Sequence, residues 1–162
     1  MSAEKSPLEG KVVMAVDDEP DVLETLADTL DMCEVVKKTS FNTAMDYLQD
    51  NRPDLVILDI MGVNGFELLK YCVEKDLPAV MLTAHAFSVE SLRKSIAMGA
   101  KAYLPKEKIS EIVPFLEDVV SMRHQETWQR LFDRLSEFLN AAFGRDWHRD
   151  VIEVGPFIVP EK

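Results

Sequence analysis

The chain has 162 residues, which is enough for one domain of common size with a segment left over. Its composition, 47% hydrophobic and 29% charged, is that of an ordinary soluble globular protein. The formal net charge of -11 argues against sequence-independent binding to nucleic acid phosphates. Cys33 and Cys72 lie in separate hydrophobic segments without metal-ligand spacing, which indicates buried thiols in a reducing compartment. A polar N-terminus and the lack of a membrane-length apolar run lead us to expect a cytoplasmic protein without a membrane span.

Short apolar runs alternate with longer amphipathic segments along most of the chain. The runs predict strands at 11–16, 34–39, 54–59, 78–83 and 100–104. Helical spacing predicts helices at 19–32, 40–50, 64–75 and 88–99. Ser40 and Ser88 stand at N-cap positions, and Gly99 supplies a C-terminal stop. This alternation predicts an α/β fold, a doubly wound parallel sheet with helices on both faces.

Polar side chains follow four of the predicted strands. Asp17 and Asp18 follow the first, Asp59 ends the third, Thr83 ends the fourth, and Lys106 comes shortly after the fifth. One such residue alone is more often a helix cap than a functional group. In open parallel sheets, however, ligands bind outside the carboxyl ends of the strands. The set therefore predicts a site at one edge of the sheet.

The consecutive acids Asp17, Asp18 and Glu19 repel one another unless a nearby cation neutralises their charge. A simpler interpretation is that they cap a helix, because acids favour the first helical turn and Pro20 suits an early helix position. For Glu19, capping is the expected role.

Four stretches, "VDDEPDVL", "LVILDIMGVNGFELL", "VMLTA" and "MGAKAYLPK", resemble the receiver domain of two-component response regulators. The resemblance covers about residues 10–122. It implies a flavodoxin-like receiver: a five-stranded parallel sheet in the order 2-1-3-4-5 with a phosphorylatable aspartate.

The resemblance also implies the roles of the site residues. Asp59 would accept the phosphoryl group, and Mg2+ would be bound by Asp18 directly, by Asp17 mainly through water, by Asp59, and by the backbone carbonyl of Met61. Lys106 would pair with Asp59 at rest and with the phosphoryl oxygens afterwards.

For the conformational switch, the resemblance implies a threonine and an aromatic residue. Thr83 would donate its hydroxyl to the phosphoryl group, and Tyr103 would turn inward into the space that Thr83 leaves. The small Ala84 would leave the phosphoryl donor a way in. The local alternative is that Thr83 ends a strand and Tyr103 packs in the core.

Three features depart from the family's usual pattern. The turn after Asp59 lacks a proline and reaches Gly65 early, and Pro105 precedes Lys106 instead of following it. Met61 cannot position a hydrolytic water well, so we expect a long-lived phosphoryl group. His85 is either a residue that tunes phosphatase activity or an exposed loop histidine.

The chain continues beyond the usual receiver end. Ser110 would cap a helix that tolerates Pro114 in its first turn. If unbroken, this helix would end at Gly144, and its apolar stripe changes phase near 122–126. Heptad spacing then connects Trp128, Leu131, Leu135, Phe138 and Ala142. We expect a homodimer through this stripe, with packing back onto the parent receiver as the alternative. The apolar tail at 151–160 is either a docking strand or a free end.

These observations predict a tail at 1–9, a receiver domain at 10–122, a helical extension at 123–145 and a C-terminal tail at 146–162. The predicted function is that of a response regulator in a two-component phosphorelay. It would take a phosphoryl group from a sensor histidine kinase or phosphotransfer protein and would signal to a downstream protein through protein contacts. We expect no DNA-binding module and no enzymatic activity beyond self-catalysed phosphoryl uptake and loss. One alternative is a pseudo-receiver that binds partners without phosphorylation. The other is an aspartate-nucleophile phosphatase, but such enzymes need a second Asp where this chain has Met61.

Overall fold

The computed structural model describes residues 6–84 and 87–151. Strands and helices alternate as the sequence predicts, with small differences at their ends. In chain order the elements are β1 (Val12–Val16), α1 (Pro20–Thr29), β2 (Glu34–Lys38), α2 (Phe41–Asp50), β3 (Leu55–Leu58), α3 (Gly65–Glu74), β4 (Ala79–Thr83), α4 (Val89–Met98), β5 (Ala102–Pro105), the 3-10 helix η1 (Lys106–Glu111), α5 (Ile112–Ser121), α6 (His124–Phe143) and α7 (Trp147–Val151).

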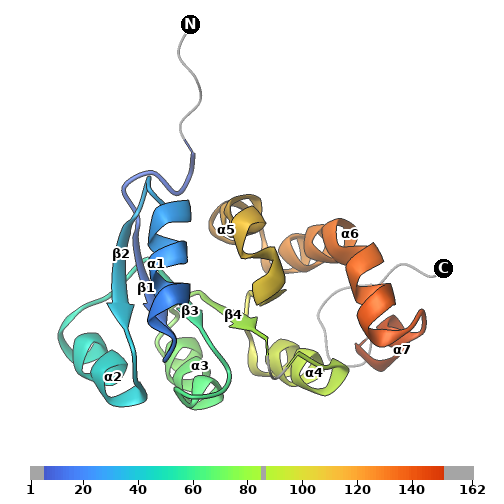
Figure 1. Ribbon diagram of the computed structural model, residues 1–162, viewed down its shortest axis with the longest axis horizontal. Helices are drawn as coiled ribbons and strands as arrows, with labels where there is room; N and C mark the ends of the chain where they lie inside the picture. The colour runs from blue at the N-terminus through green and yellow to red at the C-terminus, as the bar shows by residue number, and fades with distance from the viewer. Residues whose placement is uncertain (1–5, 85–86, 152–162) are drawn as a thin grey trace, which may run out of the picture.

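The strands form one parallel sheet in the order β2-β1-β3-β4-β5, which confirms the predicted topology. Figure 1 shows α2, α3 and α4 along one side of the sheet and α1 and α5 along the other. Because both faces are covered, every residue of β3 and β4 is buried. The edge strand β2 has no fully buried residue, as its half-polar sequence indicates.

Local signals set several helix ends as predicted. The Ser40 hydroxyl accepts a hydrogen bond from the Thr43 N–H at the start of α2, and Ser88 forms a reciprocal capping box with Ser91 at the start of α4. Gly99 ends α4 with a φ of 99°, a left-handed conformation that favours glycine. The two serine caps lie where α2 and α4 begin, at the carboxyl edge of the sheet, whereas Gly99 lies at the opposite edge, where the chain leads into β5.

The C-terminal segment differs from the predicted single helix. Residues after β5 first form η1, so α5 starts with Glu111, not Ser110, at its N-cap position. The chain then breaks at Met122, whose φ and ψ of -120° and 161° are extended. The break coincides with the change of phase in the apolar stripe, because α6 must turn to present its own apolar side to the domain. Gly144 ends α6, as predicted.

The apolar stripe of α6 is buried within the same chain. Trp128, Leu131 and Leu135 are at most 3% exposed and belong to the one hydrophobic core, while Phe138 is half-buried and Ala142 is exposed. The expected dimer seam is therefore wrong for this stripe, and the alternative of packing back onto the parent receiver is what the structure shows. The physical reason is that the uncovered edge of the sheet at β5 offers an apolar surface in the same chain.

The first described residues also contact the domain. Leu8, which falls in the expected tail, is fully buried, and the Ser6 hydroxyl donates to Glu117 Oε2 at 2.7 Å. Among the helices of the described ranges, none is both long and apolar enough to cross a membrane. The expected C-terminal tail at 146–162 is partly ordered, because Trp147–Val151 form α7 and both Trp147 and Val151 are buried. Of the apolar tail at 151–160, the residues after Val151 lie outside the described residues, as does His85.

Candidate functional site

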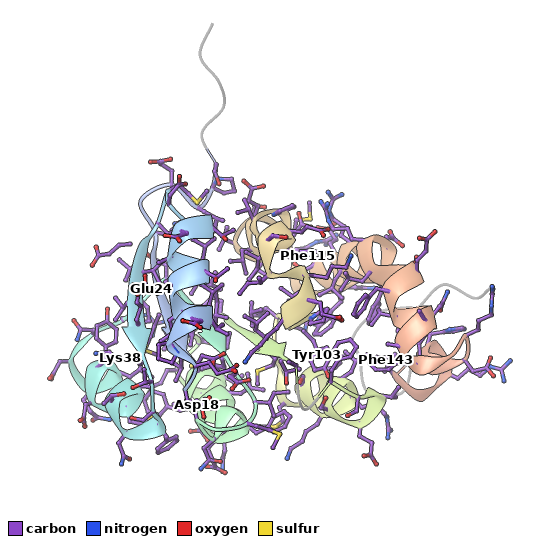
Figure 2. All side chains as sticks on the ribbon, viewed as in Figure 1. Asp18, Glu24, Lys38, Tyr103, Phe115 and Phe143 are labelled. Carbon is purple, nitrogen blue, oxygen red and sulfur yellow. The ribbon has the colours of Figure 1, made fainter. Side chains whose placement is uncertain are left out.

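The acids at the sheet edge are held by the backbone of the sheet itself. The Asp17 N–H donates to the Lys38 carbonyl, and the Asp59 N–H donates to the Val16 carbonyl, both at 3.0 Å. These bonds continue the parallel ladder one residue past the strands. Asp18, labelled in Figure 2, lies just beyond the carboxyl end of β1. The parallel topology therefore brings residues from distant parts of the chain to one edge, as predicted.

Asp17, Asp18 and Asp59 form one cluster. A carboxylate oxygen from each lies within 4.8 Å of the others. Asp17 and Asp59 are 2% and 6% exposed, whereas Asp18 is open to solvent. One carboxylate oxygen of Asp17 is used locally, because its Oδ1 accepts a hydrogen bond from the Glu19 N–H at 2.9 Å. The cluster thus has a buried side and a solvent-accessible side.

Lys106 supplies the positive charge that the acids require. It follows β5 directly, and its Nζ lies 2.8 Å from Asp17 Oδ2, 2.9 Å from Glu19 Oε1 and 3.4 Å from Asp59 Oδ1. The expected pairing with Asp59 is present but is the longest of the three. At rest the ammonium is shared among three carboxylates, with Asp17 and Glu19 closest.

Glu19 has a different role from the one expected. It occupies the N-cap position of α1, but its side chain makes no capping hydrogen bond. Instead, its carboxylate accepts a hydrogen bond from Lys106, which lies 87 residues away. No sequence pattern marks this pair, since only the fold brings the start of α1 next to the end of β5.

The pKa values reflect this crowding. Burial, and then the neighbouring charge of Asp17, raise the pKa of Asp59 from 3.8 to about 6, although Lys106 acts in the opposite direction. Burial opposes the charged form of Lys106, but hydrogen bonds to Asp17 and Glu19 outweigh it and raise the pKa of this lysine. The lysine is therefore a permanent cation, and Asp59 is a carboxylate held at an energetic cost.

The short turn after Asp59 approaches the site closely. Gly62 has a φ of 86°, and a Cβ built on it would lie 2.7 Å from Asp18 Cγ. A Cβ on Gly65 would lie 2.8 Å from Ile60 Cα, next to the Asp59 backbone. Sequence reasoning noted Gly65 but missed Gly62, whose only signal was a glycine three residues after Asp59. The side chain of Met61 is 54% exposed, so most of it faces solvent.

The predicted switch residues lie on the two neighbouring strands. Thr83 ends β4, is fully buried, and pairs in register with Pro105, the residue before Lys106. Tyr103 on β5 is already 1% exposed, and its hydroxyl contacts Ser91 Oγ and accepts the Ser88 N–H at 3.0 Å. In this structure the Tyr103 ring therefore already lies on the inside and is tied to the start of α4. The exposed Ala84 follows Thr83, as expected for an open entrance.

The donor set of the cluster suits a hard divalent cation. Its three side chains offer oxygen ligands only, which Mg2+ prefers, and the exposed Asp18 leaves room for the waters that Mg2+ retains. Asp17, Asp18 and Asp59 are thus the residues that would hold such an ion.

Comparison with known proteins agrees with this geometry. Residues 13–116 match the response regulator receiver domain. The chain is 40% identical over 103 residues to the two-component response regulator ARR18 of Arabidopsis thaliana, an alignment that covers 60% of this chain and 16% of that protein.

Two solved structures have the same fold. One is a response regulator receiver protein from Burkholderia phymatum, with 26% identity, a TM-score of 0.62, and coverage of 70% of this chain and 97% of that chain. The other is the receiver domain of NtrX from Brucella abortus, with 27% identity, a TM-score of 0.61, and coverage of 68% and 99%. With the matching sheet order and acidic edge, these findings show that the chain belongs to the response regulator receiver domain family.

Proposed function

We propose that this protein is the phosphoacceptor of a two-component phosphorelay and that Asp59 receives the phosphoryl group. The observation that carries the proposal is the position of Asp59, a nearly buried carboxylate at the carboxyl edge of the sheet with Asp17, Asp18 and Lys106 around it. The donor would be a phosphohistidine of a sensor kinase or of a phosphotransfer protein.

In the transfer, an oxygen of the Asp59 carboxylate bonds to phosphorus while the bond from phosphorus to the histidine nitrogen breaks. The nitrogen keeps the electron pair, and Asp59 becomes an acyl phosphate. The signal would end by hydrolysis: water attacks the phosphorus, inorganic phosphate leaves and the Asp59 carboxylate is restored. Such transfers depend mainly on alignment and charge neutralisation. The chain needs no further catalytic activity, so we class it as a signalling protein and not as an enzyme.

The residues around Asp59 would share the work of neutralisation. Bound Mg2+ would supply positive charge to the phosphoryl oxygens, held by Asp18 directly, by Asp17 mainly through water, by Asp59, and by the Met61 carbonyl. Lys106, already 3.4 Å from Asp59, needs only a small movement to reach a phosphoryl oxygen. Its compact ammonium suits such a contact.

Signalling would start when Thr83 donates its hydroxyl to the new phosphoryl group, because Thr83 ends the strand beside the one that Asp59 follows. Tyr103 lies one strand further along the sheet and would respond to the shift of Thr83. We propose that the output passes through protein contacts, since a formal net charge of -11 opposes contact with nucleic acid phosphates.

Labelling with a small phosphodonor and Mg2+ tests the proposal. The protein should gain one phosphoryl group, and Asp59→Asn should remove it, because the amide is not a nucleophile for phosphorus. Asp54→Asn is a matched control, since Asp54 is an exposed aspartate at the opposite end of β3 and should leave labelling unchanged. Stoichiometric labelling of Asp59→Asn at another residue would refute the assignment of Asp59.

A further inference from the structure

Glu19 binds Lys106 almost as closely as the buried acid Asp17 does. The Lys106 Nζ lies 2.9 Å from Glu19 Oε1, compared with 2.8 Å from Asp17 Oδ2 and 3.4 Å from Asp59 Oδ1. The side chains of Asp17 and Asp59 are 3% and 7% exposed, whereas the side chain of Glu19 is 52% exposed. The ammonium is therefore shared between two buried carboxylates and one carboxylate that faces solvent.

The side chain of Glu19 is not required for the start of α1 or for the oxygen cluster. The backbone holds the start of the helix, because the Glu19 carbonyl accepts the Val22 N–H at 3.1 Å and the Glu19 N–H donates to Asp17 Oδ1 at 2.9 Å. Within the described ranges, the cluster of carboxylate oxygens consists of three aspartates and does not include Glu19. The pair with Lys106 can therefore be removed without removing a helix cap or an ion ligand.

The ammonium of Lys106 has a fixed charge and a limited number of contacts. Although burial opposes its charged form, hydrogen bonds to Asp17 and Glu19 raise the pKa of Lys106, so its pairing and not its protonation is what can change. An ammonium has three N–H groups, and here it is already within reach of three carboxylates. To bind a phosphoryl oxygen on Asp59, Lys106 must give up one of its present partners.

The exposures of the acids decide which partner Lys106 gives up. Asp17 Oδ2 is fully enclosed by protein, and an enclosed carboxylate that loses its cation is left as a buried, uncompensated charge. Glu19 is half exposed, so water can solvate its carboxylate after the ammonium leaves. Glu19 is therefore the partner whose loss costs the least.

We propose that Glu19 is a positioning residue that competes with the phosphoryl group for Lys106, and that it thereby opposes phosphorylation of Asp59. This inference rests on the proposed function. At rest Glu19 holds the ammonium beside Asp17. After transfer Lys106 keeps Asp17, leaves Glu19 and binds a phosphoryl oxygen, so the favourable pair with Glu19 is lost on phosphorylation. If Glu19 served only to orient Lys106 toward Asp59, its removal would have the opposite effect and would slow the transfer.

The variant Glu19→Gln keeps the size of the side chain but removes its charge. The full chain is treated with a small phosphodonor and Mg2+, and labelling is followed by intact-protein mass spectrometry. We expect labelling to become faster by about two- to fivefold, the factor that corresponds to an ion pair with an exposed partner. Glu24→Gln is the matched control, because Glu24 is exposed on the same helix and pairs with Lys37 at 2.7 Å, and it should label like the wild type.

Binding of beryllofluoride gives the same comparison at equilibrium and without turnover. This anion takes the place of a phosphoryl group on a carboxylate, and its binding in the presence of Mg2+ is measured by fluorine NMR. Its affinity should rise in Glu19→Gln by the same factor as the labelling rate and should stay unchanged in Glu24→Gln.

Two comparisons test whether Glu19 acts through Lys106. Acetyl phosphate and phosphoramidate differ in charge, so direct repulsion of the donor by Glu19 would change the two labelling rates by different factors. Action through Lys106 predicts the same factor for both donors. In a Lys106→Met background the effect of Glu19→Gln on beryllofluoride binding should largely disappear, because the two residues then no longer form a pair.

The outcomes separate the inference from the function on which it rests. Slower or unchanged labelling of Glu19→Gln, while wild-type Asp59 labels fully, overturns the inference alone. Unequal factors for the two donors, or an undiminished effect in the Lys106→Met background, overturns the route through Lys106. Failure of wild-type Asp59 to label overturns the proposed function, and the inference with it.

Discussion

Replacement of Trp128 by alanine should destabilise the whole chain strongly. The indole is fully buried in the core that also contains the strands, and its N–H bonds to the Ala100 carbonyl at 3.2 Å. Truncating a buried tryptophan to alanine costs about 3–5 kcal/mol, and the lost hydrogen bond is part of that cost here. Because domains of this size are stable by only about 5–15 kcal/mol, the loss is a large share of the total.

Urea unfolding followed by far-UV circular dichroism measures this change. The wild type should unfold in a single transition, because α6 shares one hydrophobic core with the sheet. Trp128→Ala should lower the midpoint with the slope unchanged. Ser136→Ala is the control: Ser136 is exposed on the same helix, and its replacement should change stability by no more than about 0.5 kcal/mol. A loss below about 1 kcal/mol for Trp128→Ala, or a separate early transition of the wild type, would refute the packing of α6 onto the receiver.

Three further predictions concern the acidic cluster. Folding raises the pKa of Asp59 from 3.8 to about 6. Between these two pH values, Asp59 keeps its proton in the folded state but has lost it in the unfolded state. Without Mg2+, stability should therefore fall as pH rises through this window. Asp59→Asn should remove that pH dependence and should be more stable than the wild type at neutral pH by up to about 3 kcal/mol. Thermal melts in which the stability of the wild type rises with pH through this window would contradict the burial argument. Asp18→Ala should weaken Mg2+ binding, measured by calorimetry, far more than Glu19→Ala, because Asp18 belongs to the oxygen cluster whereas Glu19 pairs with Lys106; equal losses would mean that the ligand is wrongly assigned. Gly62→Ala should weaken Mg2+ binding and lower stability by about 1–3 kcal/mol, because its Cβ would overlap the Asp18 carboxylate at a positive φ; a fully stable variant would show that the turn moves freely.

Much of the fold follows from local sequence. The apolar run of β3 at Leu55–Leu58 predicts a strand that is buried on both faces, and the structure buries all of it. Ser88 and Gly99 mark the two ends of α4 because a hydroxyl and a left-handed residue satisfy backbone groups within a few residues of themselves. Such signals need no knowledge of the rest of the molecule.

Part of the site was predictable for a similar reason. Once the strands are parallel, their carboxyl ends must share one edge, so Asp17, Asp59 and Thr83 had to come together. The pairing of Lys106 with Glu19 was not predictable, because it depends on the direction of a flexible side chain across 87 residues of sequence. The close approach of Gly62 to Asp18 likewise depends on the path of the turn after Asp59.

The C-terminal helix shows where sequence stops being sufficient. The spacing of Trp128, Leu131 and Leu135 determined that α6 would bury one side, since an apolar stripe of this kind is unfavourable in water. It did not determine the surface that covers this side, because a second copy and the chain's own β5 edge both satisfy the same pattern. The tertiary structure decided the matter through the break at Met122, which turns α6 back, and through partners such as Asp118 and the Ala100 carbonyl that only the folded domain brings within reach.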